Sequence, residues 1–482
     1  MKKGFTLIEL LIVIAIIAVL AAVVFVALNP LQRFKETRNV QRWSDVDAIA
    51  GAIRLYQNAG SYINTQWIGT ESGVKLASGT SGTYTSQIFS ASTLSAWTTL
   101  YWSPSQPSYK ELPNNQASES SYNSGNANMS GNVLLYHLNE TSGTITDSSG
   151  SGNAGTYNGS LYGQTGKFNR AIGFAGSSDY IDAGNASSLN LSGDFTVEAW
   201  VKKLTNPTVS YAGIITKGIG YAKGGSFSLS LHKIRSVYFF VRNANNTGYA
   251  ASGPYYLGTG WTHLVGVFEA NDKVSLYANG VLIDDSPVSW DININNLPVQ
   301  LGKQNSYFHG SMDEVAIYNR ALSPDEVLSH YRRGANRLRF QVRSCADNAC
   351  SGESFIGPDG TAATYYTELN NSTIGLPALN LTNLADNQYF QYQVNFNTDR
   401  AVYSPILKSV TVGIASAGGG RDVLVDSCLD LGSILVSHLP QIPFDPSLGD
   451  SNKTYYALQR DETGQVNVQA CAAEGEEIKV TR

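Results

Sequence analysis

Residues 7–28 read LIELLIVIAIIAVLAAVVFVAL, a run of apolar side chains interrupted by a single charge, Glu9. At about 1.5 Å per residue, a helix of this length crosses the roughly 30 Å of hydrocarbon in a bilayer. A secretory signal has a shorter apolar region and a small-x-small cleavage site, and no Ala-x-Ala occurs in residues 15–28. The run therefore predicts a membrane-spanning helix, and Lys2 and Lys3 place its N-terminal end in the cytoplasm by the positive-inside rule.

Glu9 does not suit a plain membrane anchor. A carboxylate within an apolar helix costs on the order of 3 kcal/mol in lipid unless a cation pairs with it or it is neutralised. Two interpretations follow from the residues alone. Either Glu9 lies close enough to the lipid headgroups to be hydrated, or it is a functional residue whose partner is a cation.

The residues around Glu9 carry a resemblance. Residues 1–9, Met-Lys-Lys-Gly-Phe-Thr-Leu-Ile-Glu, followed by the apolar run, resemble the class III signal of type IV pilins and type II secretion pseudopilins. The resemblance implies that a prepilin peptidase removes the leader 1–4 by cutting after Gly4 and that Phe5 is then N-methylated. It also implies that Glu9 neutralises the terminal amine of a neighbouring subunit, a charge pair that selects one axial register in an apolar bundle.

The helix is expected to continue beyond the membrane, over residues 5–60. After Pro30, apolar side chains recur in steps of three and four residues from Val40 to Tyr56, which is a helical period. This second half is amphipathic, so a sheet must cover its apolar stripe. Residues 421–482 contain two strand-like segments and resemble the last strands of a pilin head, and this resemblance implies a disulfide between Cys428 and Cys471.

The middle of the chain is predicted to be all β. Residues 195–201 and 261–265 alternate in the manner of strands, and 274–278 lead into an Asn279-Gly280 hairpin turn. The segments at 136–140, 147–150, 171–174, 261–263, 277–280 and 310–323 together resemble bacterial laminin-G-like domains of the concanavalin A-like lectin/glucanase superfamily, over residues 131–335. The resemblance implies a jelly roll. It leaves the function open, because the superfamily includes sugar binders, protein binders, enzymes and spacers.

A third unit is expected to be divided by this domain. Alternating segments within 337–415 provide too few strands for a sandwich, and residues 75–113 have the character of the missing strands. We therefore expect a split β-sandwich from which the laminin-G-like domain is looped out. Residues 114–131 and 415–420 have the composition of flexible linkers. The predicted fold class is α+β: a long N-terminal helix with a small C-terminal antiparallel sheet, plus nested all-β insertions.

The four cysteines form an even set, as expected in an oxidising compartment, although sequence alone allows three pairings. Cys345 and Cys350 enclose four residues, so a local disulfide between them is expected.

Composition excludes some classes of function. The 482 residues allow roughly three domains at about 150 residues each. Lys and Arg number 33 against 38 Asp and Glu, and the net charge of -5 provides no basic field for nucleic acid. No Glu-x-Asp-x-x-Glu pattern occurs, and the adjacent Asp313 and Glu314 would point to opposite faces of a strand. We expect neither catalytic residues nor an enzyme.

Calcium is the one cofactor that the laminin-G resemblance implies. It would lie between Asp147 and Asp313, which offer the hard oxygen donors that calcium takes. The alternative is that Asp147 caps a turn and Asp313 forms a salt bridge. A sugar site would require exposed Tyr or Trp faces, and with 27 Tyr in the chain the sequence does not select among them.

The sequence is compatible with three functions. The first is a minor or tip pilin-like subunit that displays the laminin-G-like domain for adhesion to a glycan or a surface protein. The second is a pseudopilin of a secretion or DNA-uptake filament, and the third is a membrane-anchored binding protein that does not polymerise. The first two imply other pilin subunits and the prepilin peptidase as partners. They also imply a single-pass inner-membrane protein that then enters an extracellular pilus or a cell-envelope pseudopilus.

Overall fold

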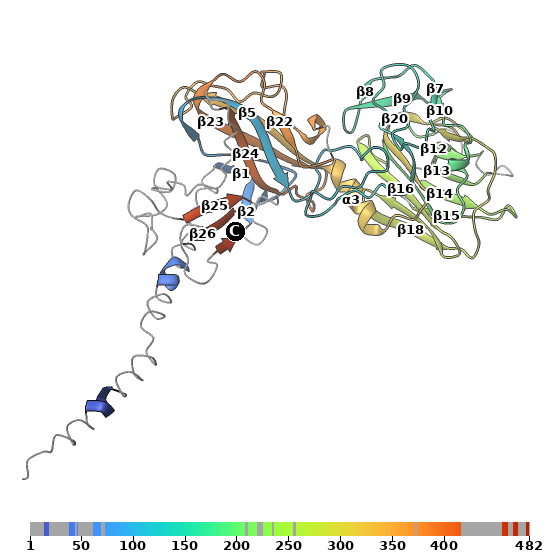
Figure 1. The fold of residues 1–482 in the computed structure, drawn as a ribbon. Helices are drawn as coiled ribbons and strands as arrows, with labels where there is room; N and C mark the ends of the chain where they lie inside the picture. The colour runs from blue at the N-terminus through green and yellow to red at the C-terminus, as the bar shows by residue number, and fades with distance from the viewer. Residues whose placement is uncertain are drawn as a thin grey trace, which may run out of the picture. The chain divides into compact units, whose positions relative to one another are not determined.

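The fold is mostly β, as the computed structural model in Figure 1 shows. It describes residues 14–18, 38–43, 46, 61–68, 73–207, 211–218, 225–233, 236–253, 257–371, 374–415, 456–460, 466–470 and 479–481. The chain divides into two units, Met1–Gly60 with Ala415–Arg482 and Ser61–Ile414.

The first unit contains helix and a small sheet. Residues 14–18, 38–43 and 46 are helical, and the rest of the helix expected over 5–60 lies outside the described residues. In the part of the chain that the structure describes, no helix combines the length and apolarity needed to span a membrane. The sheet consists of β25 (Tyr456–Arg460), β26 (Val466–Ala470) and β27 (Lys479–Thr481), paired antiparallel. The sequence predicted the first two of these strands and missed the third.

Strands from both sides of the laminin-G-like domain share one nine-stranded sheet, in the order β1-β4-β23-β5-β24-β3-β2 with β21 on β23 and β22 on β5. The strands are β1 (Ser61–Ile63), β2 (Thr65–Ile68), β3 (Gly73–Leu76), β4 (Ser81–Thr85), β5 (Phe89–Pro104), β21 (Asn336–Cys345), β22 (Ala378–Asn380), β23 (Asn387–Thr398) and β24 (Leu407–Ala415). Tyr84 of β4 lies opposite Val394 of β23, so the register joins segments about 300 residues apart. The sheet begins at Ser61, upstream of the start expected at residue 75, because β1 to β3 join it.

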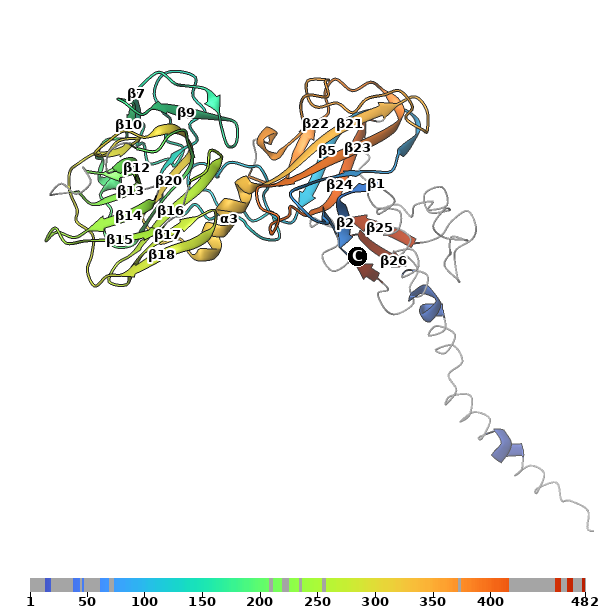
Figure 2. The same ribbon diagram turned by 180° about the vertical axis from the view of Figure 1, so that it is seen from behind.

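The laminin-G-like part has two facing sheets (Figures 1 and 2). The seven-stranded sheet has the order β15-β14-β13-β12-β19-β10-β7, and the eight-stranded sheet β18-β17-β16-β11-β20-β9-β8 with β6 on β20. The seven strands are β7 (Thr156–Asn158), β10 (Tyr180–Asp182), β12 (Tyr211–Lys217), β13 (Phe227–His232), β14 (Val237–Arg242), β15 (Gly248–Gly253) and β19 (Val299–Leu301). The eight are β6 (Asn132–Tyr136), β8 (Gln164–Thr165), β9 (Arg170–Ala175), β11 (Phe195–Lys203), β16 (Trp261–Glu269), β17 (Lys273–Ala278), β18 (Val281–Pro287) and β20 (His309–Tyr318).

Local sequence explains this layout. Alternate residues of the two sheets, such as Phe195, Phe239 and Leu264, are fully buried in one core between them. Asn279 and Gly280 both have positive φ, 51° and 74°, as the two-residue turn between β17 and β18 requires. After β20, helix α3 (Pro324–Ala335) begins with a capping box formed by Ser323 and Glu326 and leads directly into β21.

The segment before the laminin-G-like domain is packed, although its composition suggested a flexible linker. Tyr122, Ala127 and Met129 are buried, and Glu119 is 6% exposed. The expectation for residues 114–131 was wrong because a few buried side chains fix a segment that is otherwise rich in Asn, Ser and Gly.

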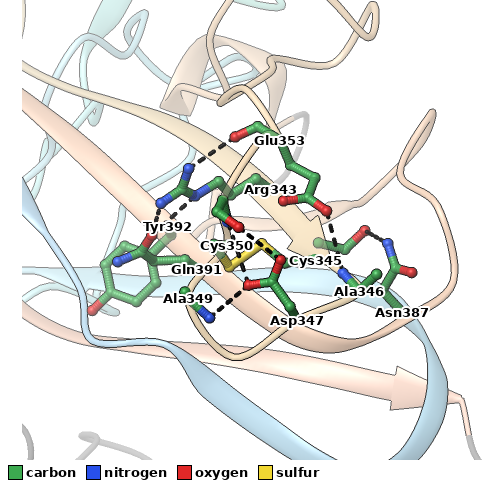
Figure 3. The surroundings of a disulfide bond; sticks show 12 residues. Arg343, Cys345, Ala346, Asp347, Ala349, Cys350, Glu353, Asn387, Gln391 and Tyr392 are labelled. Atoms are coloured by element: carbon green, nitrogen blue, oxygen red, sulfur yellow. Dashed lines mark hydrogen bonds between the residues drawn. A yellow bond between two sulfur atoms is a disulfide. The ribbon is translucent and has the colours of Figure 1, made fainter.

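A disulfide joins Cys345 and Cys350 at the end of β21, and both cysteines are buried. Figure 3 shows Arg343 beside it, where the guanidinium donates to the Gln391 side chain and to the Glu353 carbonyl. This local bridge is the one that the spacing predicted. Cys428 and Cys471 lie outside the described residues.

Candidate functional site

The outer face of the seven-stranded sheet carries a group of aromatic side chains. In β14, Val237, Phe239 and Val241 belong to the buried core. Because side chains alternate along a strand, Tyr238 and Phe240 lie on the opposite, outer face, and both are half-buried. The sheet therefore presents aromatic rings on the side away from its core.

Three rings from three adjacent strands meet on this face. Tyr211 lies directly opposite His232, and their ring centroids are 4.5 Å apart. The Tyr238 ring is 5.5 Å from Tyr211 at an interplanar angle of 90°, and 5.5 Å from His232. All three are half-buried. They form a continuous platform whose edge-to-face contacts hold the rings in place.

A short hairpin at residues 303–307 extends the platform. Ser306 donates its backbone N–H to the Tyr211 carbonyl at 2.9 Å, and Lys303 lies opposite Tyr307 in an isolated bridge. The Lys303 ammonium lies 4.1 Å from the ring centroid of Tyr180 and 6.0 Å from that of Tyr307. We call Tyr180, Tyr211, His232, Tyr238, Lys303 and Tyr307 the aromatic surface.

The charges of this surface are few. Burial and the nearby Lys233 lower the pKa of His232, so its ring is neutral at pH 7. Among the described residues, the Lys303 ammonium has no carboxylate partner within 4.0 Å. Asp182 on neighbouring β10 is occupied, since its oxygens accept from Gln300 at 3.0 Å and from the Gly184 N–H at 2.8 Å.

Asp147, one of the two residues expected to bind calcium, caps a turn. Its Oδ1 accepts the backbone N–H groups of Leu135 and Ser149, each at 3.0 Å, and its Oδ2 accepts that of Asn153 at 2.8 Å. This is the turn-capping alternative weighed from the sequence. A calcium ion would have to displace these three donors from the carboxylate.

Asp313, the other expected ligand, is fully buried in β20. Its Oδ2 accepts the backbone N–H groups of Lys167 at 2.6 Å and Phe168 at 3.0 Å. Burial, and then the charge of Glu314, raises the pKa of Asp313 well above its usual range. None of the ion pairs among the described residues involves Asp313, so the salt bridge weighed from the sequence is absent there. The calcium site stays a prediction.

A different group of possible metal ligands comes together at Glu111, His137 and Glu314, whose ligand atoms all lie within 4.8 Å of one another. His137 Nδ1 contacts Glu314 Oε1, and its Nε2 lies 2.6 Å from Asn114 Oδ1. Burial would lower the pKa of His137, but the Glu314 charge and hydrogen bond outweigh it and raise the pKa to about 9. In its protonated form the ring donates from both nitrogens, and His137 and Glu314 then form an ion pair.

Glu198 of β11 forms a second buried group with His263 and His330. Its oxygens lie 3.1 Å from His263 Nε2 and from His330 Nδ1, and it accepts the Tyr318 hydroxyl at 2.9 Å. Burial alone would raise the pKa of Glu198, but the charge and hydrogen bonds of the two histidines hold it well below its usual range. The adjoining cavity is about 10 Å³, far too small for a sugar ring, so the group is structural.

The sequence missed the aromatic surface. The alternation of β14 was the available signal, because a strand with one face in the core must present Tyr238 on the other face. Nothing in the sequence showed that Tyr211, Lys303 and Tyr180 lie beside it, since these residues come from three segments that only the sheet order brings together. Gly4, Phe5 and Glu9, predicted for processing and assembly, lie outside the described residues.

Two family models match this chain. Residues 175–328 match the concanavalin A-like lectin/glucanases superfamily, and residues 1–25 match the prokaryotic N-terminal methylation motif. The methylation motif implies processing at the inner membrane and export into a pilus or pseudopilus.

Curated proteins with a similar region include adhesion G-protein coupled receptor D1. The human protein (Homo sapiens) is 29% identical over 106 residues, which cover 20% of this chain and 12% of the receptor. The bovine protein (Bos taurus) is 30% identical over 101 residues, covering 20% of this chain and 11% of the receptor. The chain thus spans only about an eighth of the length of these receptors.

Solved structures to which part of the chain is similar include the binding domain of Paraclostridial Mosquitocidal Protein 1, with a TM-score of 0.36, 16% identity, and coverage of 45% of this chain and 61% of that one. Domain 4 of the arabinanase AbnA from Geobacillus stearothermophilus has a TM-score of 0.34 and 22% identity, and the match covers 41% of this chain and 96% of that one. The CBM40 of the Ruminococcus gnavus IT-sialidase has a TM-score of 0.29 and 19% identity, and the match covers 33% of this chain and 96% of that one.

The family models agree with the resemblances seen in the sequence. The chain carries a prokaryotic N-terminal methylation motif at residues 1–25 and a laminin-G-like domain of the concanavalin A-like lectin/glucanase superfamily, matched over residues 175–328.

Proposed function

We propose that this chain is a minor or tip subunit of a type IV pilus-like filament whose laminin-G-like domain binds carbohydrate. The observation that carries the binding half is the aromatic surface, where the rings of Tyr211, His232 and Tyr238 from three adjacent strands lie half-buried on the outer face of a sheet. Sugars present apolar C–H faces that stack on such rings, while their hydroxyl groups bond to polar groups at the edge. The proposal is binding without catalysis.

The assembly half is supported by the methylation motif at residues 1–25. A membrane-anchored protein that never polymerises requires no such motif, so this third alternative is disfavoured. The unit Ser61–Ile414 is large for the head of a repeating subunit. In a filament wall built from repeating copies, so large a unit would collide with its neighbours, so a position at the tip or at sparse intervals suits this subunit better. A large binding domain exposed to the outside also favours a pilus over a secretion pseudopilus.

The binding half is tested with the full-length protein in detergent on a glycan array, followed by calorimetry on the oligosaccharides that bind. The double variant Tyr211→Ala/Tyr238→Ala should lower affinity at least tenfold, because each lost stacking contact is worth about 1 kcal/mol. Tyr101→Ala is the matched control, since Tyr101 is 45% exposed on β5 of the nine-stranded sheet, away from the aromatic surface. An array without glycan binding, together with a clear protein partner, would count against carbohydrate.

The assembly half is tested by mass spectrometry of the mature N-terminus in cells that make the prepilin peptidase. Cleavage after Gly4 and a methyl group on Phe5 are expected. The partners of the N-terminal helix would then be other pilin subunits. An intact Met1 would support the membrane-anchored alternative instead.

A further inference from the structure

Among the six residues of the aromatic surface, Lys303 is the one with a permanent positive charge, and its ammonium lies against aromatic rings. Its ammonium lies over the Tyr180 ring at 4.1 Å and 6.0 Å from the centroid of Tyr307, while the residue itself is half-buried. Aromatic faces attract a cation but leave its charge uncompensated. No hydrogen-bond acceptor or carboxylate contacts this ammonium among the described residues.

The hairpin that carries Lys303 is held rigidly. Phe308, next to the hairpin, is 1% exposed and packs in the core between the two sheets. Gln304 donates its backbone N–H to the Ser306 carbonyl at 3.0 Å, and the Ser306 N–H bonds to Tyr211. These contacts fix the backbone of the hairpin beside Tyr211, and the Lys303 ammonium lies over the Tyr180 ring.

We propose that Lys303 selects acidic sugars, in which a carboxylate is attached to the ring that stacks on the aromatic surface. This inference rests on the proposed carbohydrate binding. The rings of the platform would hold the sugar face, and the Lys303 ammonium would pair with the sugar carboxylate. Such a ligand would supply the carboxylate partner that the Lys303 ammonium lacks among the described residues. Sialic acids and uronic acids share this chemistry.

Other anions suit the surface less well. A nucleic acid or another polyphosphate needs several cations in a row, and the chain has a net charge of -5. A neutral sugar would leave the half-buried ammonium without a counter-ion beneath it, which costs binding energy. One ammonium beside the tyrosine rings matches one carboxylate per sugar unit.

The test measures binding of the full-length protein to two pairs of probes by calorimetry. One pair is sialyllactose and its methyl ester, and the other is trigalacturonic acid and its methyl ester, so that each pair differs in the carboxylate charge. The acid should bind about tenfold more tightly than its ester, because a charge-assisted hydrogen bond contributes about 1.5 kcal/mol or more. Which acid binds distinguishes sialic from uronic acids.

Lys303→Met should remove this tenfold preference, so that the acid and its ester bind about equally, while Lys303→Arg should keep it. Lys273→Met is the charge-matched control, because Lys273 lies on β17 of the eight-stranded sheet and pairs with Glu269. Thermal melting of each variant confirms that it is folded.

Three results would overturn the inference. Equal binding of acid and ester, or an acid preference that survives Lys303→Met, would show that the platform binds sugars without selecting charge, and the proposed function would stand. Binding of no acidic and no neutral glycan on the array would remove both proposals together.

Discussion

A single imidazole, His137, joins the segment before the laminin-G-like domain to that domain's core. Its two nitrogens contact Glu314 Oε1 and Asn114 Oδ1, and the fold holds it in the charged form. The backbone supports the arrangement at some cost, because Leu138 and Glu314 both have positive φ, 59° and 47°. Strained residues on both sides of the contact indicate that the ion pair is held by the surrounding structure.

This imidazole predicts a pH dependence of stability. The pKa of His137 is raised to about 9 in the folded state, so the pair stabilises fully below the unfolded pKa of about 6.5. The stabilisation is then lost as pH rises from about 6.5 to about 9, and the total is on the order of 3 kcal/mol. The free energy of unfolding in urea should therefore fall over this range in the wild-type protein relative to His137→Gln.

The comparison with His137→Gln is needed because other groups act in the opposite direction. Burial lowers the pKa of Lys167 and of Lys217 to about 8, and each contributes stability that increases as pH rises above that value. These contributions cancel in the difference between the two proteins. His309→Gln is the control, since the His309 ring contacts the Thr205 hydroxyl on the surface and not a buried carboxylate. An equal pH slope in wild type and His137→Gln would show that the imidazolium is not formed.

At the scale of elements, the sequence predicted many of the strands and turns. It predicted the pairing between distant strands only in part. The alternation of residues 195–201 and 261–265 predicted β11 and β16, and Asn279-Gly280 predicted the turn between β17 and β18. These signals are local, because side-chain alternation and positive φ are properties of a few consecutive residues. The strands β1 to β3 were missed, since strands of three or four residues carry too short a pattern and become stable only through partners from elsewhere in the chain.

The site was less predictable than the elements that carry it. The rings of Tyr180, Tyr211 and Tyr238 come from β10, β12 and β14, which are separated by other strands in sequence. Their proximity depends on the order β14-β13-β12-β19-β10, which no local pattern encodes. The prediction that segment 114–131 is flexible was wrong for a related reason, because Tyr122 and Glu119 are fixed by partners far away in sequence.

At the scale of the whole unit Ser61–Ile414, buried charges tie the laminin-G-like domain to the nine-stranded sheet. Arg333 of α3 donates to both oxygens of Glu119, at 2.8 and 2.7 Å, and Lys110 lies 3.2 Å from the same carboxylate. Tyr122, in the same segment, donates to Glu368 at 2.8 Å. A second contact pairs Lys167 of the laminin-G-like domain with Asp399. The domain is therefore attached through a junction of buried hydrogen bonds and not through a loose tether.

This junction predicts cooperative unfolding. In the full-length protein, the laminin-G-like domain and the nine-stranded sheet should unfold in one calorimetric transition, because neither can open without exposing the Arg333–Glu119 pair. Arg333→Leu leaves Glu119 buried and only partly compensated by Lys110, and breaking a buried pair in this way costs about 3–5 kcal/mol. The single transition should then separate into two, with the laminin-G-like domain melting independently.

Arg337→Leu is the matched control, because Arg337 pairs with Asp399 where the side chains are 24% and 29% exposed. An exposed pair of this kind contributes at most about 1 kcal/mol, so the single transition should persist with a small shift in Tm. Two transitions in the wild-type protein, or one transition that survives Arg333→Leu, would show that the domains are not coupled through α3. A rigid junction matters for the proposed function, because a ligand bound at the aromatic surface of a filament subunit would pull on the filament through this unit, and the buried charges would resist separation of the two parts.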